Sequence, residues 1–140
     1  NEYTGLHFSL PTEAQWEYAA RGGKNTYYSL YAGGGDVLEV AWIKSGSIYD
    51  INKCSEVGKK NANGLGLYDM SGNVWEMCNN WYYDYKDVCD TITSGEAYTG
   101  YKVFRGGSWN TNAQQARVTA RYKQGIHYRD YNTGFRLVIE

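Results

Sequence analysis

Glycine divides this chain into short segments, and this limits how much regular structure it can form. The 140 residues include 17 glycines, together with 15 tyrosines and five tryptophans. This composition is typical of loop-rich folds in which large amphipathic rings pack against irregular backbone. Between residues 31 and 66 glycines are so frequent that the apolar stretch from Val37 to Ile43 is the only candidate element. We therefore expect little helix and only short strands.

The clearest predicted element is a helix over Glu13 to Arg21. Thr12 can accept a hydrogen bond from the amide of Gln15, and the Gln15 side chain can return one, which makes a capping box. Trp16 lies on the face of this helix that would enter the core. The glycine pair that begins at Gly22 ends the helix, because glycine tolerates a left-handed C-terminal cap.

Five short runs bounded by Gly, Asn or Ser predict the strands of a small twisted sheet. They are Leu65 to Tyr68, Val74 to Met77, Lys102 to Arg105, Arg117 to Arg121 and Phe135 to Ile139. In the fourth run we expect Arg117 to be anchored and Val118 and Ala120 to be packed. A length of 140 residues with 42% hydrophobic content fits one domain over residues 1–140. The predicted class is α+β, with a mostly antiparallel sheet and one or two helices.

Charge and hydropathy exclude two classes of partner for this stretch of chain. The net charge is -1 and the basic residues are scattered, so no nucleic-acid footprint is present. No apolar run approaches the ~20 residues of a membrane helix, and no direct membrane insertion is expected. Cys54, Cys78 and Cys89 have neither zinc spacing nor the density of a disulfide scaffold. Free buried thiols are favoured over a Cys78–Cys89 bridge, which an exported protein would allow.

Three long motifs follow one another along the chain. They are Leu10 to Arg21, Gly66 to Glu76, and Arg105 to Trp109 together with Gly134 to Arg136. In this order they resemble the formylglycine-generating enzyme, or sulfatase-modifying factor, superfamily, and the resemblance covers nearly the whole chain. It implies a variant of the C-type lectin fold. Relatives carry another strand and helix before the first motif, so we expect a minimal domain or the C-terminal part of a longer protein.

The resemblance also implies where catalytic residues would lie. Formylglycine-generating enzymes use two cysteines shortly after the Gly-Gly-Ser motif, which bind copper(I) because thiolates are soft ligands. Thr111 and Ala116 stand at approximately these positions, so we expect no copper and no enzyme of this kind. His7 and His127 are the only imidazoles and lie in no hydrolase pattern. Glu13 with Glu17, and Asp69 with Glu76, are carboxylate pairs without evidence that either converges on one pocket, and solvation of the helix surface explains the first pair at least as well as catalysis does.

A structural calcium site is implied in the second motif. In relatives, one calcium is held by the positions that match Asp69, Gly72, Val74 and Glu76, with backbone oxygens from the middle two. Oxygen donors of this kind suit calcium. The alternative is a turn without a cation, in which Gly72 has a positive φ and Trp75 is buried. No open pair of ligands for a sugar is expected in either case.

The segment from Trp109 to Thr133 is the candidate binding region. Tyrosine and tryptophan offer a large contact area for little lost side-chain entropy, while Asn, Gln and Thr supply adaptable hydrogen bonds. The alternative is that the tyrosines only cover the sheet. The candidate residues are Trp109, Asn110, Thr111, Asn112, Gln114, Tyr122, Gln124, Ile126, His127, Tyr128, Asp130, Tyr131 and Asn132.

One branch of the superfamily keeps the motifs on either side of this segment and lacks the catalytic cysteines. It resembles the variable proteins of diversity-generating retroelements, in which codons near the C-terminus are rewritten to give many binding surfaces on one fold. The resemblance implies a non-catalytic module that presents residues 109–133 to a protein or a surface glycan, as in adhesion at a bacterial cell or phage surface. Two alternatives stay open: a sulfatase-modifying-factor-like domain with a structural or regulatory role, and a metal-dependent enzyme.

Overall fold

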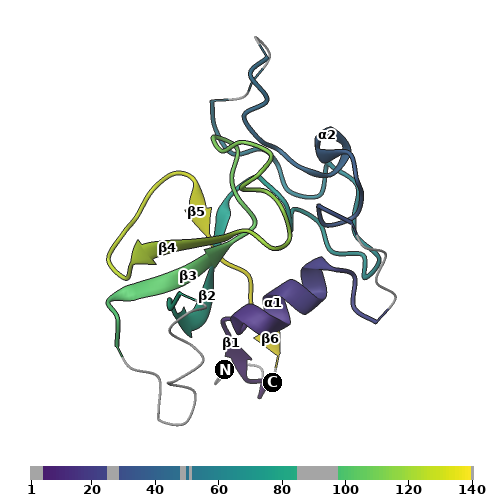
Figure 1. The fold of residues 1–140 in the computed structure, drawn as a ribbon. Coiled ribbons are helices and arrows are strands. Elements are labelled where there is room, and N and C mark those ends of the chain that lie inside the picture. Colours follow the sequence, from purple (N-terminus) through teal and green to yellow (C-terminus); the bar gives the residue numbers. More distant parts are fainter. Residues whose placement is uncertain (1–4, 25–28, 48–49, 51, 85–97, 140) are drawn as a thin grey trace.

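The computed structural model describes residues 5–24, 29–47, 50, 52–84 and 98–139. Its elements confirm the α+β class, with two helices and strands that are mostly antiparallel (Figure 1). In chain order they are β1 (Phe8–Ser9), α1 (Glu13–Ala20), α2 (Val37–Val40), β2 (Trp75–Trp81), β3 (Tyr101–Arg105), β4 (Arg121–Gly125), β5 (Thr133–Gly134) and β6 (Val138–Ile139). None of the described helices is long and apolar enough to cross a bilayer.

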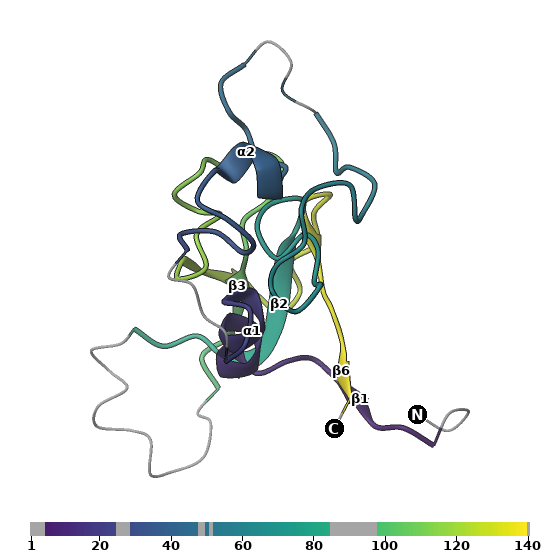
Figure 2. The ribbon, with the colours of Figure 1, turned by 90° about the vertical axis from the view of Figure 1, so that its right-hand side faces the viewer.

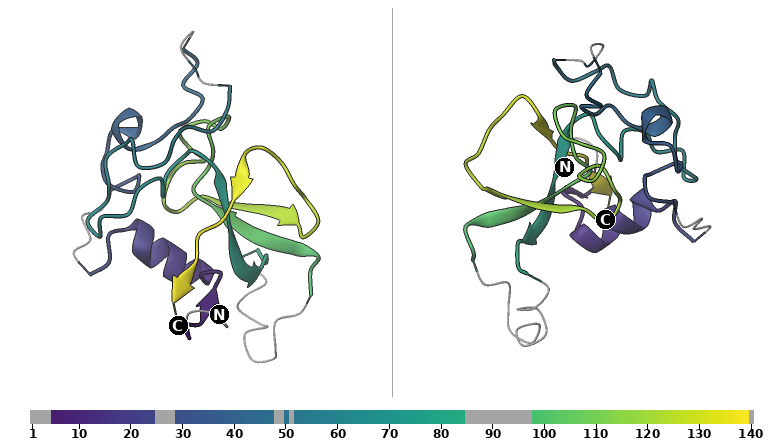
Figure 3. Two further views of the ribbon diagram at one scale, coloured as in Figure 1. Left: turned by 180° about the vertical axis from the view of Figure 1, so that it is seen from behind. Right: turned by 45° about the horizontal axis from the view of Figure 1, so that its top comes forward.

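The main sheet has the strand order β4-β3-β2-β5. β3 pairs antiparallel with both β2 and β4, whereas β5 runs parallel to β2. β1 and β6 form a separate two-stranded ribbon beside α1 (Figure 2). The loops that contain α2 lie above the sheet, as the two views in Figure 3 show. The four-stranded sheet is therefore the frame on which the C-terminal segment is mounted.

Strand register gives the main sheet two distinct faces. Val103 pairs with Lys123, and Phe104 pairs with Tyr122. Because side chains alternate along a strand, the two pairs lie on opposite faces. Val103 packs with Trp16 of α1, and we call this side the α1 face. Tyr122 lies on the other side, which we call the outer face.

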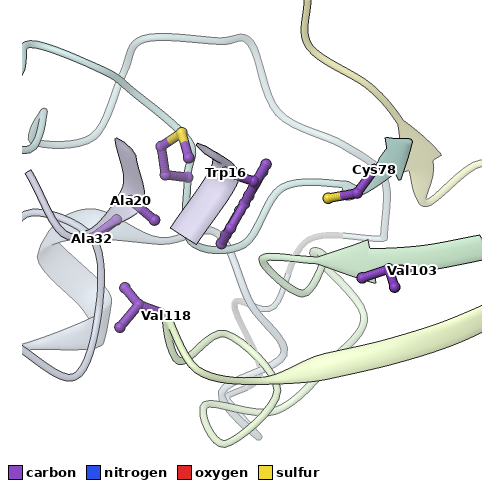
Figure 4. Close-up of a cluster of buried hydrophobic side chains, with 7 residues drawn as sticks. Trp16, Ala20, Ala32, Cys78, Val103 and Val118 are labelled. Carbon is purple, nitrogen blue, oxygen red and sulfur yellow. The ribbon is translucent and has the colours of Figure 1, made fainter. Parts of the chain in front are cut away.

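The first helix forms as predicted. The Thr12 hydroxyl accepts a hydrogen bond from the Gln15 amide at 3.2 Å, and Thr12 N donates to Gln15 Oε1 at 2.8 Å, which is the predicted capping box. Gly22 follows the helix with a φ of +86°. Trp16 is almost fully buried and anchors the larger core cluster with Cys78 (Figure 4).

A second core cluster supports the loops above the sheet. It joins Val40 of α2 to Ala41, Ile43, Tyr31 and Ala116. The stretch Val37 to Ile43 is thus an element only in its first half, where Asp36 caps the single turn of α2 by accepting from Leu38 N at 2.9 Å.

Gly72 shows why this packing needs glycine. Its φ is +76°, and a Cβ at this position would lie 2.4 Å from the carbonyl oxygen of Trp42. The predicted positive φ is therefore confirmed. Trp75 is buried as predicted, and Trp109 is half-buried.

Two of the five predicted strands are wrong, and the last, Phe135 to Ile139, is strand only over Val138–Ile139. Leu65 to Tyr68 is a turn, because Asn63 Oδ1 accepts hydrogen bonds from the amides of Leu65 and Leu67 and replaces ladder bonds there. Arg117 to Arg121 is also mostly turn, and β4 begins only at its last residue.

Burial differs from the sequence prediction at two positions, Arg117 and Cys54. Val118 enters the core as expected, but Arg117 is exposed and is not anchored. The buried arginine of the fold is Arg105. Cys78 is a free buried thiol, whereas Cys54 is free but exposed. Cys89 lies outside the described residues.

Candidate functional site

The C-terminal half of the predicted binding segment lies on the outside of the sheet. β4 and β5 occupy opposite edges of the sheet, so residues 126–132 must cross from one edge to the other (Figure 3). The exposed fractions are 90% for Tyr131, 42% for Tyr128, 40% for Tyr122 and 38% for Ile126. We call these four residues the tyrosine face. None of them lies in the interior, so they do not merely fill the core.

Tyr122 differs from the other members because it is fixed to the sheet. Its ring stacks on Trp75 with centroids 5.0 Å apart and an interplanar angle of 20°. Trp75 is buried on β2, two strands away, and Phe104 of the intervening strand pairs with Tyr122 in register. Stacked aromatic pairs of this kind stabilise a fold by more than the burial of their surface area alone. One side of Tyr122 therefore belongs to the core, and the rest faces solvent.

Asp130 holds the loop that carries Tyr128 and Tyr131. Its Oδ2 accepts from the Tyr128 hydroxyl at 2.6 Å, and its Oδ1 accepts from Tyr131 N at 2.7 Å. Tyr128 N donates to Gly125 O at 2.9 Å, which closes a turn after β4. The hydrogen bond to Asp130 is the first cause that raises the pKa of Tyr128 above its ordinary value, so the hydroxyl stays protonated at neutral pH. The loop has a defined conformation before any ligand arrives.

Asn110, Thr111 and Asn132 join the two ends of the segment. Asn132 Nδ2 donates to Asn110 Oδ1 at 3.0 Å, and Asn110 Oδ1 also accepts from Ser108 Oγ at 2.7 Å. The Thr111 hydroxyl donates to Ser108 O at 2.9 Å. Trp75 N donates to the main-chain oxygen of Asn132 at 2.7 Å. These predicted site residues therefore hold the frame together, in addition to any contact with a ligand.

The remaining predicted residues are spread along the segment. Gln124 is half-buried on the outer face, and His127 is exposed beside the tyrosine face. Asn112 and Gln114 are exposed on the earlier loop, and in the described part of the chain no hydrogen bond joins them to residues 122–132. Trp109 has a buried indole Nε1 that lacks a partner among the described residues.

Thr111 and Ala116, which stand approximately where the family resemblance implies catalytic cysteines, have structural roles here. Thr111 closes the turn after the Gly-Gly-Ser motif, because its Oγ1 also accepts from Ser108 N at 2.8 Å. Ala116 is fully buried in the second core cluster, and its carbonyl accepts from Ser71 Oγ at 2.8 Å. Neither side chain can supply a thiolate, and Ala116 has no access to solvent.

Glu76 joins all three sequence motifs. Its Oε2 accepts from Trp16 Nε1 at 2.7 Å and from Arg136 Nε at 2.5 Å, and its Oε1 accepts from Arg136 Nη2 at 2.6 Å. A carboxylate that is buried to this degree needs such partners, since an unpaired buried charge is costly. The motif residues thus pair with one another across the fold.

Asp69 and Glu76 fit the implied calcium site only in part. Asp69 Oδ2 accepts from Gly58 N at 2.8 Å, while its buried Oδ1 has no partner among the described residues. Glu76 does not fit as an open ligand, because both of its oxygens accept from the Arg136 guanidinium. No group of three or more His, Cys, Asp or Glu side chains suited to a metal occurs in the described part of the chain. Calcium binding through Asp69, Gly72, Val74 and Glu76 stays a prediction.

Solvation of the helix surface does not explain Glu13 and Glu17, contrary to the sequence prediction, because both carboxylates are only partly exposed and both pair with arginine. Arg105 Nη1 donates to Glu13 Oε1 at 2.7 Å, and Arg105 Nη2 donates to Glu17 Oε2 at 2.7 Å. Arg105 is fully buried on the α1 face, and its guanidinium lies 5.1 Å from the centroid of Trp16. No local signal could have revealed these pairs, because the partners are 92 and 88 residues apart.

Comparisons with known proteins place this arrangement in a family. A model of the sulfatase-modifying factor enzyme 1-like domain matches residues 2–140. The formylglycine-generating enzyme of Mycobacterium tuberculosis is 39% identical over 94% of this chain and 50% of its own length. Treponema denticola variable protein 1 superposes with a TM-score of 0.76 at 36% identity, over 93% of this chain and 46% of that chain. PvdO from Pseudomonas aeruginosa superposes with a TM-score of 0.80 at 25% identity, over 99% of this chain and 55% of that one.

These matches confirm the family resemblance and the C-type lectin-like variant of the α+β fold. They include an enzyme and a variable protein, so family alone does not decide between catalysis and binding. The chain spans about half the length of these relatives.

Proposed function

This chain belongs to the sulfatase-modifying factor family, whose model matches residues 2–140, and we propose that it is a ligand-binding module without catalytic activity. The observation that carries this proposal is the tyrosine face, in which Tyr122, Ile126, Tyr128 and Tyr131 are exposed on a frame of paired strands. Exposed apolar groups that lie together mark interaction sites. The similarity to Treponema denticola variable protein 1 supports the same proposal.

The partner that best suits this face is a protein. Tyrosines are enriched among the side chains that dominate protein interfaces, and polar groups around them form the rim. Asp130 and His127 are exposed beside the tyrosines and supply such a rim. Fixing the loop in advance reduces the entropy lost on binding. The Asp130 hydrogen bonds provide this fixation.

The absence of catalysis is proposed from residue chemistry. Copper-dependent oxidation of a cysteine needs a thiolate pair, and Thr111 and Ala116 have replaced it. The similarity to formylglycine-generating enzymes nevertheless makes oxidation of a cysteine peptide the second candidate. Copper-dependent turnover of such a peptide by the purified chain would establish that candidate and contradict the proposal.

Sequence diversification of the face is part of the proposal. Asn132 accepts from Trp75 N through its main-chain oxygen, so exchange of its side chain would keep this bond and lose only the side-chain bonds to Asn110 and Thr133. Tyr131 has most of its surface in solvent and can be exchanged at little cost. The neighbouring DNA should then hold a reverse transcriptase gene and a near-identical copy of the region that encodes residues 109–133. A locus that has neither would contradict diversification and leave the binding proposal standing.

Binding is tested with a variant that removes the face without touching the sheet. The variant combines Ile126→Ala, Tyr128→Ala and Tyr131→Ala. Protein fragments selected from a displayed library with the wild-type chain should bind this variant at least ~100-fold more weakly, because interface aromatics are commonly worth 2 kcal/mol or more each.

The matched control combines Leu65→Ala, Tyr68→Ala and Tyr98→Ala, which are similarly exposed elsewhere on the molecule. It should keep the affinity of the wild type. A parallel glycan array tests the other class of partner. Binding to glycans alone, with the same loss in the first variant, would replace the protein partner by a sugar. Equal loss of affinity in both variants would refute a ligand site at the tyrosine face.

A further inference from the structure

Lys102 and Gln124 form a polar pair on the sheet next to the tyrosine face. Strand register pairs Lys102 of β3 with Gln124 of β4 on one side and with Trp81 of β2 on the other. Lys102 lies on the outer face, because its neighbour Val103 lies on the α1 face and side chains alternate along a strand. Gln124 shares the outer face with Tyr122, two residues earlier on β4. The pair is therefore continuous with the proposed binding surface.

Lys102 is half-buried and has no carboxylate partner. Its ammonium lies 3.8 Å from the centroid of the Trp81 ring and donates a hydrogen bond to the main-chain oxygen of Asn79. Within the ranges that the structure describes, no acidic side chain pairs with it. An ammonium group carries three N–H donors, so donors remain for another group. The ring and the main-chain oxygen already hold the side chain, which reduces the entropy it would lose on binding.

Gln124 supplies a second donor beside this ammonium. Its side chain is half-buried, and it makes no hydrogen bond to any described residue. Directly paired positions of an antiparallel sheet have Cβ atoms about 4.5 to 5.5 Å apart, so Lys102 and Gln124 can reach the same group. Two N–H donors side by side, one of them charged, suit the two oxygens of a carboxylate.

The charge of this side of the molecule also favours a negatively charged partner. On the outer face and in residues 126–132, the charged side chains are Lys102, Arg129 and Asp130. Arg129 is exposed and forms no ion pair with a described residue, whereas Asp130 already accepts hydrogen bonds through both of its oxygens. Two positive charges minus one negative charge leave one positive charge, although the whole chain carries -1. Opposite charge across an interface supplies specificity.

We propose that Lys102 and Gln124 form a carboxylate subsite of the tyrosine face, and that a protein partner supplies an Asp or Glu side chain to it. This inference rests on the proposed function, because it names the partner chemistry of the same face. In an extended segment that runs along β4, side chains two positions apart are about 7 Å from each other, the spacing between Gln124 and Tyr122. The partner should therefore carry an apolar side chain two positions from the acidic one, where it contacts Tyr122.

A displayed library of random peptides tests this chemistry. Peptides selected with the wild-type chain should be enriched in Asp and Glu relative to the unselected library, with an apolar residue two positions away. Lys102→Glu reverses the charge of the subsite and should select peptides enriched in Lys and Arg instead. Lys123→Glu is the matched control, because Lys123 lies next to Gln124 on the same strand but on the α1 face. It should select the same acidic peptides as the wild type.

Affinities of one selected acidic peptide give the size of the effect. Lys102→Gln should weaken its binding at least ~10-fold, and Gln124→Ala about 5-fold. Lys123→Gln and Gln114→Ala are the controls and should bind like the wild type, and thermal melting shows whether each variant is folded. Exchanging the acidic residue of the peptide for its amide should weaken binding to the wild type at least ~10-fold and have little further effect in Lys102→Gln. This exchange leaves the chain unchanged, so it tests the subsite even where a variant is unstable.

The outcomes separate the subsite from the proposed function. Selected peptides that lose affinity for the Ile126, Tyr128 and Tyr131 triple variant, but show no acidic enrichment, would overturn the subsite and leave the tyrosine face standing. An acidic peptide that binds wild type and Lys102→Gln equally well would do the same. A library that yields no binder of the wild type, or only binders indifferent to the triple variant, would contradict the proposed function and this inference together.

Discussion

The two faces of one small sheet are built in opposite ways. On the α1 face, charged side chains from distant motifs pair with one another around the fully buried Arg105. On the outer face, Tyr128 and Tyr131 are held mainly by Asp130, their neighbour in sequence. A substitution on the α1 face removes contacts to several side chains from distant parts of the sequence, whereas a substitution of Tyr128 or Tyr131 removes at most one side-chain hydrogen bond to a described residue, that from Tyr128 to Asp130. This difference shows how one fold can keep a fixed frame and still present side chains that are free to contact a ligand.

Glu76 shows how strongly the motif residues depend on one another. It is buried between Trp16 and Arg136, which come from the first and last motifs. Removing one partner of such a buried pair costs more than the pair contributes, because the remaining charge loses its compensation. The motif residues around Glu76 therefore form a mutually dependent set beside the sheet.

The largest expected effect tests the buried network. Arg105→Ala leaves Glu13 and Glu17 without their shared partner and opens a cavity, so we expect about 3 to 5 kcal/mol of destabilisation. Urea denaturation measures this change in the free energy of unfolding. Arg117→Ala is the control, because Arg117 is exposed, and it should change stability by less than about 0.5 kcal/mol. Similar values for the two variants would mean that Arg105 does not hold the α1 face.

The next prediction compares the stability of two variants within the tyrosine face. Tyr122→Ala removes the ring that stacks on Trp75 and should destabilise the fold by about 1 to 3 kcal/mol. Tyr131→Ala should change stability by less than about 0.5 kcal/mol, since most of the side chain is in solvent. Thermal melts of the two variants give the comparison. Equal effects would show that Tyr122 is not part of the frame.

A smaller effect concerns how the free energy of unfolding falls at acid pH. Burial acts to raise the pKa of Glu17, but hydrogen bonds and charge from Arg105 and Arg21 outweigh it, so this pKa is lowered in the folded chain from its ordinary value of 4.5. Its contribution is therefore present above pH 4.5 and is lost as the pH falls through the folded pKa. Glu17→Gln should remove part of this acid-induced loss, by less than about 1 kcal/mol because the site is partly solvated.

Unfolding curves at several pH values below neutrality measure this change. Glu56→Gln, which alters an exposed pair with Lys59, is the matched control. A pH profile of Glu17→Gln that coincides with the wild type would show that Glu17 carries no such linkage.

The smallest expected effect is that of calcium. Because Arg136 engages both oxygens of Glu76, calcium would have only Asp69 and the backbone oxygens of Gly72 and Val74 as open ligands, so we expect a weak site and little change in the unfolding midpoint on adding calcium or a chelator. A bound ion at 100 times its Kd would instead add about 2.7 kcal/mol. Such a gain, abolished by Asp69→Asn and retained in Asp130→Asn, would establish the site that the family resemblance implies.

The sequence by itself determined the first helix and both of its ends. The capping box at Thr12 and the glycine after α1 depend on hydrogen bonds between residues three or four positions apart, which a pattern reveals. The motif order was also sufficient to predict the family and the α+β fold. The apolar and polar mixture of residues 122–132 predicted an exposed face, and the exposure of Tyr128 and Tyr131 agrees with it.

Only the tertiary structure decided which charged side chains pair and where β4 begins. Glu13 meets Arg121 across 108 positions of sequence, and Glu76 meets Arg136 across 60. Such pairs depend on strand register and on how α1 packs against the sheet, which no local pattern encodes. The same reason explains the late start of β4, because its residues are strand only where β3 lies beside them.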